Sequence, residues 1–327
     1  MLRYSALLKD TKAYLSLQSD LSAGRLNHCY MIMGEDKLAV DNLIDLFCET
    51  ILCKDGGCGK CVICQKVEDK NHEDVIEPKV VGDRGERREA DGIREFVEKA
   101  YIKSVGDIKI MVIRAIDEID MKVQNFLLKS LEEPIDGVVF LLGVTKQSAV
   151  LDTIKSRSKK LSVTPFSKRA LTAFFDDNYI GKPKSLIEES IDCCMGSLSR
   201  FESLLNDEEY FGDMSEIIFV LKELTSTKVN LKMQKRLDVK DNKDGKLSRY
   251  LDIMQLIIGV LLKRKSGVYV EGFERVNVLL DCFNIATLVN FNELITDAKQ
   301  KIASYCNAGN ILDNLFIKMM EVKYLCR

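Results

Sequence analysis

The sequence lacks an excess of charge of either sign, and it lacks long apolar runs. Its 48 Lys and Arg residues nearly balance 50 Asp and Glu residues, and the formal net charge is -2. This balance argues against a chain coated with cations for nucleic acid, so any such contact must be local. No apolar run approaches the length that a membrane-spanning helix needs, and we expect no contact with a membrane.

The N-terminal segment lacks the apolar core of a secretion signal and the pattern of a transit peptide. Residues 1–5 are mixed and are soon followed by Lys9, Asp10 and Lys12. The chain nevertheless has 11 cysteines. Without a secretion signal, these cysteines indicate a reducing, cytoplasmic location, where clustered thiols are more often metal ligands than disulfides.

A complete nucleotide-binding P-loop is missing where the chain would place one. The apolar run 29–33 predicts a strand, Gly34 follows it, and residues 38–52 have helical spacing. A P-loop then needs a second glycine, a lysine and a hydroxyl. Those three positions hold Ala39, Val40 and Asp41. Lys37 lies only three residues past Gly34, too near for the backbone to wrap a triphosphate. We predict a degenerate loop that does not support ATP hydrolysis.

Four cysteines fall within twelve residues, in a segment that also holds glycines: Cys53, Cys58, Cys61 and Cys64. Tetrahedral zinc needs four soft donors, and C-x-x-C steps with small neighbours let the chain fold around the ion. Two other interpretations stay open, a redox pair at Cys61 and Cys64 or free buried thiols. A redox pair would not need the other two cysteines, so we predict a structural zinc site. His72 would then be superfluous as a ligand.

An acidic pair, Asp117 and Glu118, follows the apolar run 110–113, which predicts a strand. A pair directly after a strand could hold magnesium in a nucleotidase. Here Arg114 and Ala115 directly follow the strand, so the acidic pair begins three residues later than a metal-binding pair would. It is as well explained by carboxylates that favour a helix N-terminus. We expect the pair not to be catalytic.

Strand and helix patterns alternate from residue 29 to residue 163, which predicts a wound α/β sheet. The continuous apolar run 138–142 is typical of a strand that is covered on both faces. Beyond Pro165 the pattern is helical only. Boundaries near Pro165 and within residues 206–212 divide the chain into three predicted domains: 1–165, 166–210 and 211–327.

Two patterns in the second half carry less information. Residues 238–252 resemble a calcium loop, but a register with Gly245 at the sixth position puts Lys240 and Leu251 at ligand positions, so an EF-hand is excluded. The segment 228–249 is rich in Lys and Arg and is either a basic surface for DNA or a partner, or a solvated helix face. The interspersed acids favour the solvated face.

Five motifs stand out in the first half of the chain. They are residues 24–28 (Gly-Arg-Leu-Asn-His), the four-cysteine segment, residues 71–74 (Asn-His-Glu-Asp), residues 125–134 (Asn-Phe-Leu-Leu-Lys-Ser-Leu-Glu-Glu-Pro) and residues 153–158 (Thr-Ile-Lys-Ser-Arg-Ser). Together they resemble the delta-prime subunits of the bacterial DNA polymerase III clamp loader. The resemblance is specific over residues 20–166, and beyond them only helical character and length agree.

The resemblance implies a RecA-like AAA+ α/β domain with a zinc-binding insert at residues 53–64, a small helical lid domain and a C-terminal helical collar domain. It also implies a hetero-pentamer with ATPase motor (tau/gamma) subunits and a delta subunit, which loads the sliding clamp onto primer-template DNA. The nucleotide site of this subunit is non-functional in the family, in agreement with the loop at Gly34 and Lys37. Two alternatives stay open: an active AAA+ ATPase with an atypical loop, and a zinc-containing DNA-binding module independent of any loader.

The resemblance implies one chemical role for this chain. Arg157 matches the arginine of the family's Ser-Arg-Cys motif, which projects into the ATP site of a neighbouring motor subunit. A planar, permanently charged guanidinium suits a transferring γ-phosphoryl group, so we expect Arg157 to act in trans as an arginine finger. Ser158 stands where the family usually has cysteine, which leaves the local packing open. ATPase members of the family have their metal-binding acids at the positions of Arg114 and Ala115.

Overall fold

The computed structural model describes residues 2–78, 89–178, 181–207, 209–224, 246–270, 272–303 and 308–325. These residues form two compact units. Unit 1 comprises Met1–Ile180 with Gly196–Arg200, and unit 2 comprises Gly181–Met195 with Phe201–Arg327. The calcium-loop pattern at Gly245 and most of the basic segment 228–249 lie outside the described residues. The three domains predicted from the sequence stay a prediction.

Unit 1 is built around a five-stranded sheet in which all paired strands are parallel. The spatial order is β2-β3-β4-β1-β5. The strands are β1 (Cys29–Met33), β2 (Val75–Ile76), β3 (Lys109–Ile113), β4 (Val138–Val144) and β5 (Lys159–Ser162). Every residue of β1, β3 and β4 is buried, as expected for continuous apolar runs between two helical layers.

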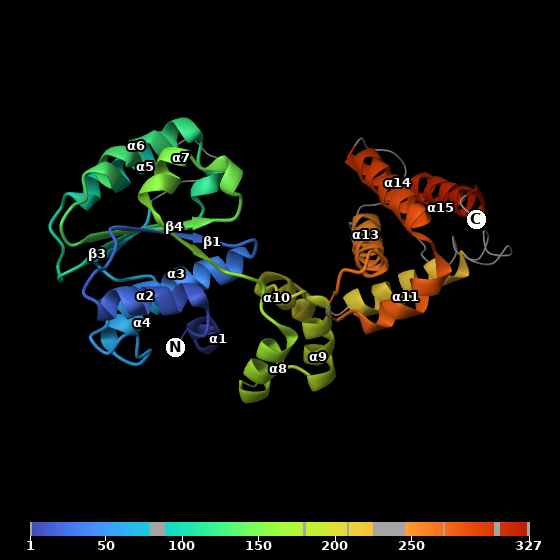
Figure 1. Cartoon of the computed structure of the whole chain (residues 1–327), viewed down its shortest axis with the longest axis horizontal. Coiled ribbons are helices and arrows are strands. Elements are labelled where there is room, and N and C mark those ends of the chain that lie inside the picture. Colours follow the sequence, from blue (N-terminus) through green and yellow to red (C-terminus); the bar gives the residue numbers. More distant parts are fainter. Residues whose placement is uncertain are drawn as a thin grey trace. The chain divides into compact units, whose positions relative to one another are not determined.

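Helices cover both faces of this sheet (Figure 1). One layer contains α5 (Glu89–Ala100), α6 (Met121–Glu132) and α7 (Asp152–Arg157), and the opposite layer contains α2 (Lys12–Ser22), α3 (Lys37–Leu52) and α4 (Val62–Glu68). Alternate residues of a strand point to opposite faces. Met31 of β1 therefore packs in the core beneath α5 and α6. Tyr30 points to the opposite face, where its ring meets the ring of Phe47 in α3 edge-on, with the ring centroids 6.1 Å apart.

Shorter elements complete unit 1. They are α1 (Ser5–Lys9), α8 (Lys168–Asp177), the start of α10 (Leu198–Asn206) and two short 3₁₀ helices, η1 (Ile116–Glu118) and η2 (Gln147–Ala149). The wound α/β domain with a parallel sheet that the sequence predicts is thus confirmed.

The described elements of unit 2 are all helices. Its elements are α9 (Lys184–Cys193), the rest of α10, α11 (Tyr210–Glu223), α13 (Lys246–Lys265), the 3₁₀ helix η3 (Glu274–Cys282), α14 (Ile285–Ala303) and α15 (Ala308–Leu325). Within the described ranges, no single helix has the length and apolarity to cross a membrane. One pair bent by 113°, Glu274–Cys282 with Ile285–Ile302, could do so by length and composition alone.

Gly143 of β4 is a position where the fold needs the absence of a side chain. A Cβ there would overlap the carbonyl oxygen of Arg114, which follows the neighbouring strand β3. Interiors are close-packed and yield little to added atoms.

We predict that Gly143→Ala lowers the free energy of unfolding by about 1–3 kcal/mol, because strand β4 must move away from Arg114. The matched control is Gly212→Ala in α11, where an added Cβ meets nothing within 4 Å and helix propensity improves. Thermal unfolding of both variants measures the difference. Equal melting temperatures for Gly143→Ala and the unsubstituted protein would contradict the packing described.

Candidate functional site

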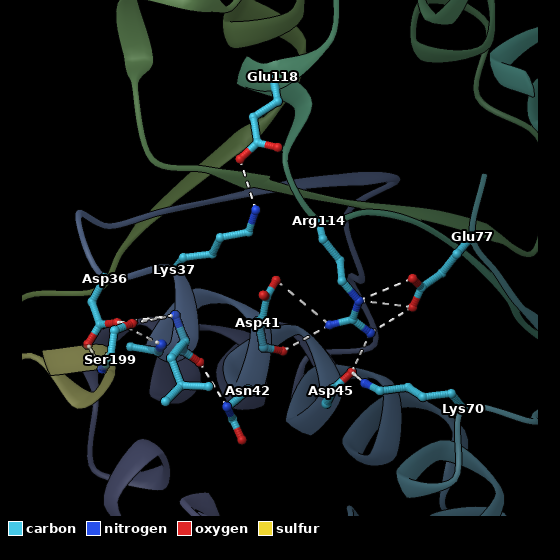
Figure 2. Close-up of polar contacts among 12 residues, drawn as sticks. Asp36, Lys37, Asp41, Asn42, Asp45, Lys70, Glu77, Arg114, Glu118 and Ser199 are labelled. Atoms are coloured by element: carbon cyan, nitrogen blue, oxygen red, sulfur yellow. Dashed lines mark hydrogen bonds and ion pairs between the residues drawn. The ribbon is translucent and has the colours of Figure 1, made fainter. Parts of the chain in front are cut away.

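The turn between β1 and α3 is closed by a carboxylate of the chain itself (Figure 2). Asp36 is the N-cap of α3, and its side chain accepts hydrogen bonds from the N–H groups of Leu38 at 3.1 Å and Ala39 at 3.4 Å. The N-terminus of a helix is a place where proteins bind phosphate, because its N–H groups and dipole favour negative charge. Asp36 places its own negative charge there.

The same carboxylate also caps a second helix. It accepts hydrogen bonds from the N–H groups of Leu198 and Ser199, in the first turn of α10, and from the Ser199 hydroxyl. The Ser199 hydroxyl oxygen accepts in turn from the N–H of Leu38 at 3.2 Å. All these residues belong to unit 1. Two helix N-termini therefore share one carboxylate, and both helix dipoles stabilise its charge.

Lys37 is paired with a carboxylate. Its Nζ lies 2.8 Å from Oε1 of Glu118, and this hydrogen bond raises the pKa of Lys37 above its ordinary value (Figure 2). The two side chains are 51% and 63% exposed, so the pair contributes little to stability. Lys37, the lysine nearest to this turn in the sequence, is thus held by an acid of the chain.

The acidic pair predicted from the sequence is divided between two partners. Glu118 binds Lys37, whereas Oδ2 of Asp117 accepts hydrogen bonds from the hydroxyl of Thr145 at 2.7 Å and from the N–H groups of Thr145 and Lys146 at 3.1 and 2.7 Å. Asp117 thus caps the turn after β4. The two carboxylates do not converge on one position.

Arg114 follows β3, and carboxylates from several elements surround it (Figure 2). Its guanidinium lies 2.6 Å from Glu77, 2.7 Å from Asp45 and 3.9 Å from Asp41, and Lys70 also pairs with Asp45. Burial opposes the charge of the guanidinium, but Glu77 and Asp45 outweigh it and raise the pKa of Arg114. A permanent cation at this position repels a divalent metal ion.

We predict that Arg114→Met lowers the free energy of unfolding at pH 7 by about 2–4 kcal/mol, because it leaves partly buried carboxylates without their counter-charge. Burial already raises the pKa of Asp41, against the opposing effect of Arg114. A carboxyl with a raised folded-state pKa destabilises the fold as pH rises through that value, so the deficit of the variant should shrink at pH 5.

Urea unfolding at pH 5 and pH 7 measures this difference. Lys37→Met is the matched control, because its exposed ion pair should change stability by no more than about 1 kcal/mol at either pH. A deficit for Arg114→Met that does not depend on pH would contradict the role given to the surrounding carboxylates.

Arg157 is the last residue of α7, and its side chain is 33% exposed. Nη1 donates to the carbonyl oxygen of Thr153 at 2.9 Å, and Nη2 lies 2.7 Å from Oε1 of Glu132, at the end of α6. The guanidinium is thus folded back along its own helix and reaches the neighbouring one.

Ser158, where the family resemblance has cysteine, forms two contacts. Its hydroxyl donates to the carbonyl oxygen of Ile154 at 2.8 Å and lies 3.1 Å from Sγ of Cys29 in β1. Burial raises the pKa of Cys29 to about 12, so this thiol stays neutral. The serine therefore ties the end of α7 to the sheet, directly beside Arg157.

The four cysteines predicted as zinc ligands come together, with all four sulfur atoms within 4.8 Å of one another. Sγ of Cys53 lies 3.8 Å from that of Cys58 and 3.7 Å from that of Cys61, and Cys58 and Cys64 are 4.0 Å apart. Four sulfurs bound to zinc at about 2.3 Å have edges of about 3.8 Å in a regular tetrahedron. The donor set therefore fits a tetrahedral ion.

Backbone hydrogen bonds lower the pKa of Cys53 and Cys58, whereas burial raises the pKa of Cys64. Partial burial opposes ionisation of Cys53, but hydrogen bonds from the N–H groups of Cys58 and Gly57 outweigh it and lower its pKa to about 6. Gly57 has a φ of +81°, and an added Cβ would lie 3.1 Å from the Thr50 hydroxyl. His72 is not part of the cluster. Its Nδ1 accepts a hydrogen bond from the N–H of Asp74 at 3.1 Å and caps a turn.

Several residues of the site were not found from the sequence. Asp36 had a local signal, since a carboxylate directly before a helical pattern is typical of an N-cap. Ser199, Glu77 and Glu132 had none, because each meets its partner only through the fold. The structure thus shows which acids pair with Arg114 and Arg157. It also shows the second helix whose first turn donates hydrogen bonds to Asp36.

Comparison with known proteins finds similarity over the first half of the chain. Residues 9–167 match the family model described as DNA polymerase III, delta subunit. The chain is similar to the DNA polymerase III subunit gamma of Buchnera aphidicola (strain APS), with 28% identity over 190 residues, which are 57% of this chain and 50% of the relative. It is also similar to the DNA polymerase III subunit delta' of Bacillus subtilis, with 27% identity over 158 residues, 47% of each chain.

Among solved structures, a DNA polymerase III gamma subunit-related protein of Thermotoga maritima aligns with 98% of both chains at 17% identity and a TM-score of 0.42. A score this low adds no argument about fold or function. The matched region is half or less of the length of the two curated relatives. Over residues 9–167, the chain is therefore similar to the delta, gamma and delta' subunits of DNA polymerase III.

Proposed function

We propose that this chain is a delta-prime-type clamp-loader subunit that does not hydrolyse ATP and that supplies Arg157 in trans to a neighbouring motor subunit. The observation that carries the proposal is the state of its own loop. Asp36 holds the anion position at the start of α3, and Lys37 is paired with Glu118. Like charges repel, so a nucleotide phosphate meets a carboxylate where it needs bare N–H groups.

The metal position supports the same proposal. Magnesium is bound through carboxylates and phosphate oxygens. Arg114 stands after β3, where ATPases of the family have acids, and it already engages Glu77 and Asp45. In this proposal, the described residues around the loop offer neither the cradle nor the metal ligands for ATP, whereas the side chain of Arg157 is partly exposed.

The proposal includes the assembly that the family resemblance implies. The chain joins tau/gamma motor subunits and a delta subunit in a hetero-pentamer that places the sliding clamp on primer-template DNA. The two curated relatives described above are gamma and delta-prime subunits of DNA polymerase III. In this proposal residues 166–210 form the lid domain and residues 211–327 the collar, and the described elements of both ranges are helices.

A second candidate is an active ATPase with an atypical loop. It is favoured by one observation, that the gamma relative matches the chain as well as the delta-prime relative does, at 28% against 27% identity. The two candidates differ in ATP turnover by the isolated chain. The non-hydrolysing subunit has none, whereas the active ATPase hydrolyses ATP without a partner.

We predict that Arg157→Ala slows ATP turnover at the adjoining motor site by about a thousandfold or more, the usual contribution of an arginine finger. The measurement is DNA-stimulated ATPase and clamp loading by a complex reconstituted with the variant. Arg169→Ala, which removes an exposed arginine of α8, is the matched control and should leave both rates unchanged. Unchanged ATPase and clamp loading with Arg157→Ala would refute the role in trans.

We further propose that Cys53, Cys58, Cys61 and Cys64 hold one structural zinc ion, which closes the insert between α3 and α4. All four coordination positions are then taken by protein ligands, so the ion has no open position for catalysis.

Metal analysis of the purified chain is predicted to find about one zinc per chain. Cys58→Ser should lower both the zinc content and the melting temperature, because binding of a structural metal contributes to the free energy of folding. Cys282→Ser, outside the cluster, should retain the metal. Less than about half an equivalent of zinc, together with unaltered stability of Cys58→Ser, is the result that this site does not allow.

A further inference from the structure

The guanidinium of Arg157 has an acidic partner that the proposed role in trans does not use. Glu132 is the last residue of α6, and its Oε1 lies 2.7 Å from Nη2 of Arg157. The other terminal nitrogen of the guanidinium, Nη1, donates to the carbonyl oxygen of Thr153 at 2.9 Å. These two contacts hold the arginine along α7, with two thirds of its side chain covered.

The position of Glu132 makes this pairing favourable for both side chains. A carboxylate at the C-terminus of a helix faces the negative end of the helix dipole, and a cation beside it offsets that cost. Arg157 also stands at the C-terminus of its own helix, where a cation is favoured. The pair therefore needs no further ligand to form in the separate chain.

The pairing is nevertheless weak enough to exchange. The Glu132 side chain is 49% exposed and that of Arg157 is 33% exposed. An ion pair with this exposure shifts an equilibrium by no more than about fivefold. A γ-phosphoryl group carries more negative charge than a carboxylate and accepts two parallel hydrogen bonds from a guanidinium, so it competes successfully for the same N–H groups.

We propose that Glu132 is the resting partner of Arg157. It holds the guanidinium folded against α7 until a nucleoside triphosphate bound by a neighbouring subunit replaces it as the acceptor. This inference rests on the proposed function of Arg157. Glu132 is thus a positioning residue. Its ion pair with Arg157 must break before the arginine binds the phosphate, which reduces the net free energy of that binding.

The test is Glu132→Gln in the reconstituted complex, measured as kcat/KM for ATP. Glutamine keeps the size of the side chain and removes its charge, so kcat/KM should rise two- to fivefold, a gain of about 0.4–1 kcal/mol. The gain should shrink at high ionic strength, because salt already screens the exposed pair. A purely structural effect of the substitution would not depend on salt in this way.

Two controls separate this inference from the proposed function. Glu133→Gln removes the same charge one residue further along and should leave kcat/KM unchanged. Glu132→Gln should also have no effect in a chain that already carries Arg157→Ala. Thermal unfolding of each variant confirms that the fold is retained.

The outcomes are distinguishable. If Arg157→Ala slows turnover but Glu132→Gln leaves kcat/KM unchanged or lowers it, the resting-partner role is wrong and the role of Arg157 stands. If Glu132→Gln raises kcat/KM equally with and without Arg157, its effect does not pass through the arginine and the inference is wrong. If Arg157→Ala itself is silent, the proposed function fails and this inference fails with it.

Discussion

The structure of the turn between β1 and α3 depends on one carboxylate. Asp36 accepts hydrogen bonds from the first turns of α3 and α10, so two helix N-termini point their N–H groups at a charge that the chain supplies itself. Helix N-termini are effective anion sites because unpaired N–H groups and the dipole act together. Here that capacity joins α3 to α10 within unit 1, and in the proposed function it is not available to a nucleotide.

The remaining polar groups at the same edge of the sheet follow the same principle of internal pairing. Lys37 binds Glu118, Asp117 caps the turn after β4, and Arg114 is held by Glu77 and Asp45. A parallel sheet usually presents its ligand site at the carboxyl ends of its strands. In this chain those ends are occupied by the chain's own charges. Arg157 differs, because its partner Glu132 is half exposed and, in our proposal, is replaced by a phosphate.

The sequence predicted the elements of this sheet better than its contacts. Continuous apolar runs marked β1, β3 and β4, and four close-spaced cysteines predicted the cluster, because both signals are local. The missing P-loop residues were also readable. The sequence did not predict which side chains pair at the loop, because Ser199 lies far along the chain from Asp36. The ion pairs of Arg114 and Arg157 also join separate elements. Periodicity carries no information about such pairings, so the fold had to bring them together.

We infer that the nucleotide position of this chain is already filled by its own side chains. Equilibrium binding of a fluorescent ATP analogue to the isolated chain, with and without magnesium, distinguishes a filled position from an open one. We expect no saturable binding and no turnover, because Asp36 and Arg114 occupy the positions that phosphate and metal need. Tight, magnesium-dependent binding accompanied by hydrolysis would contradict it and would identify the chain as an ATPase.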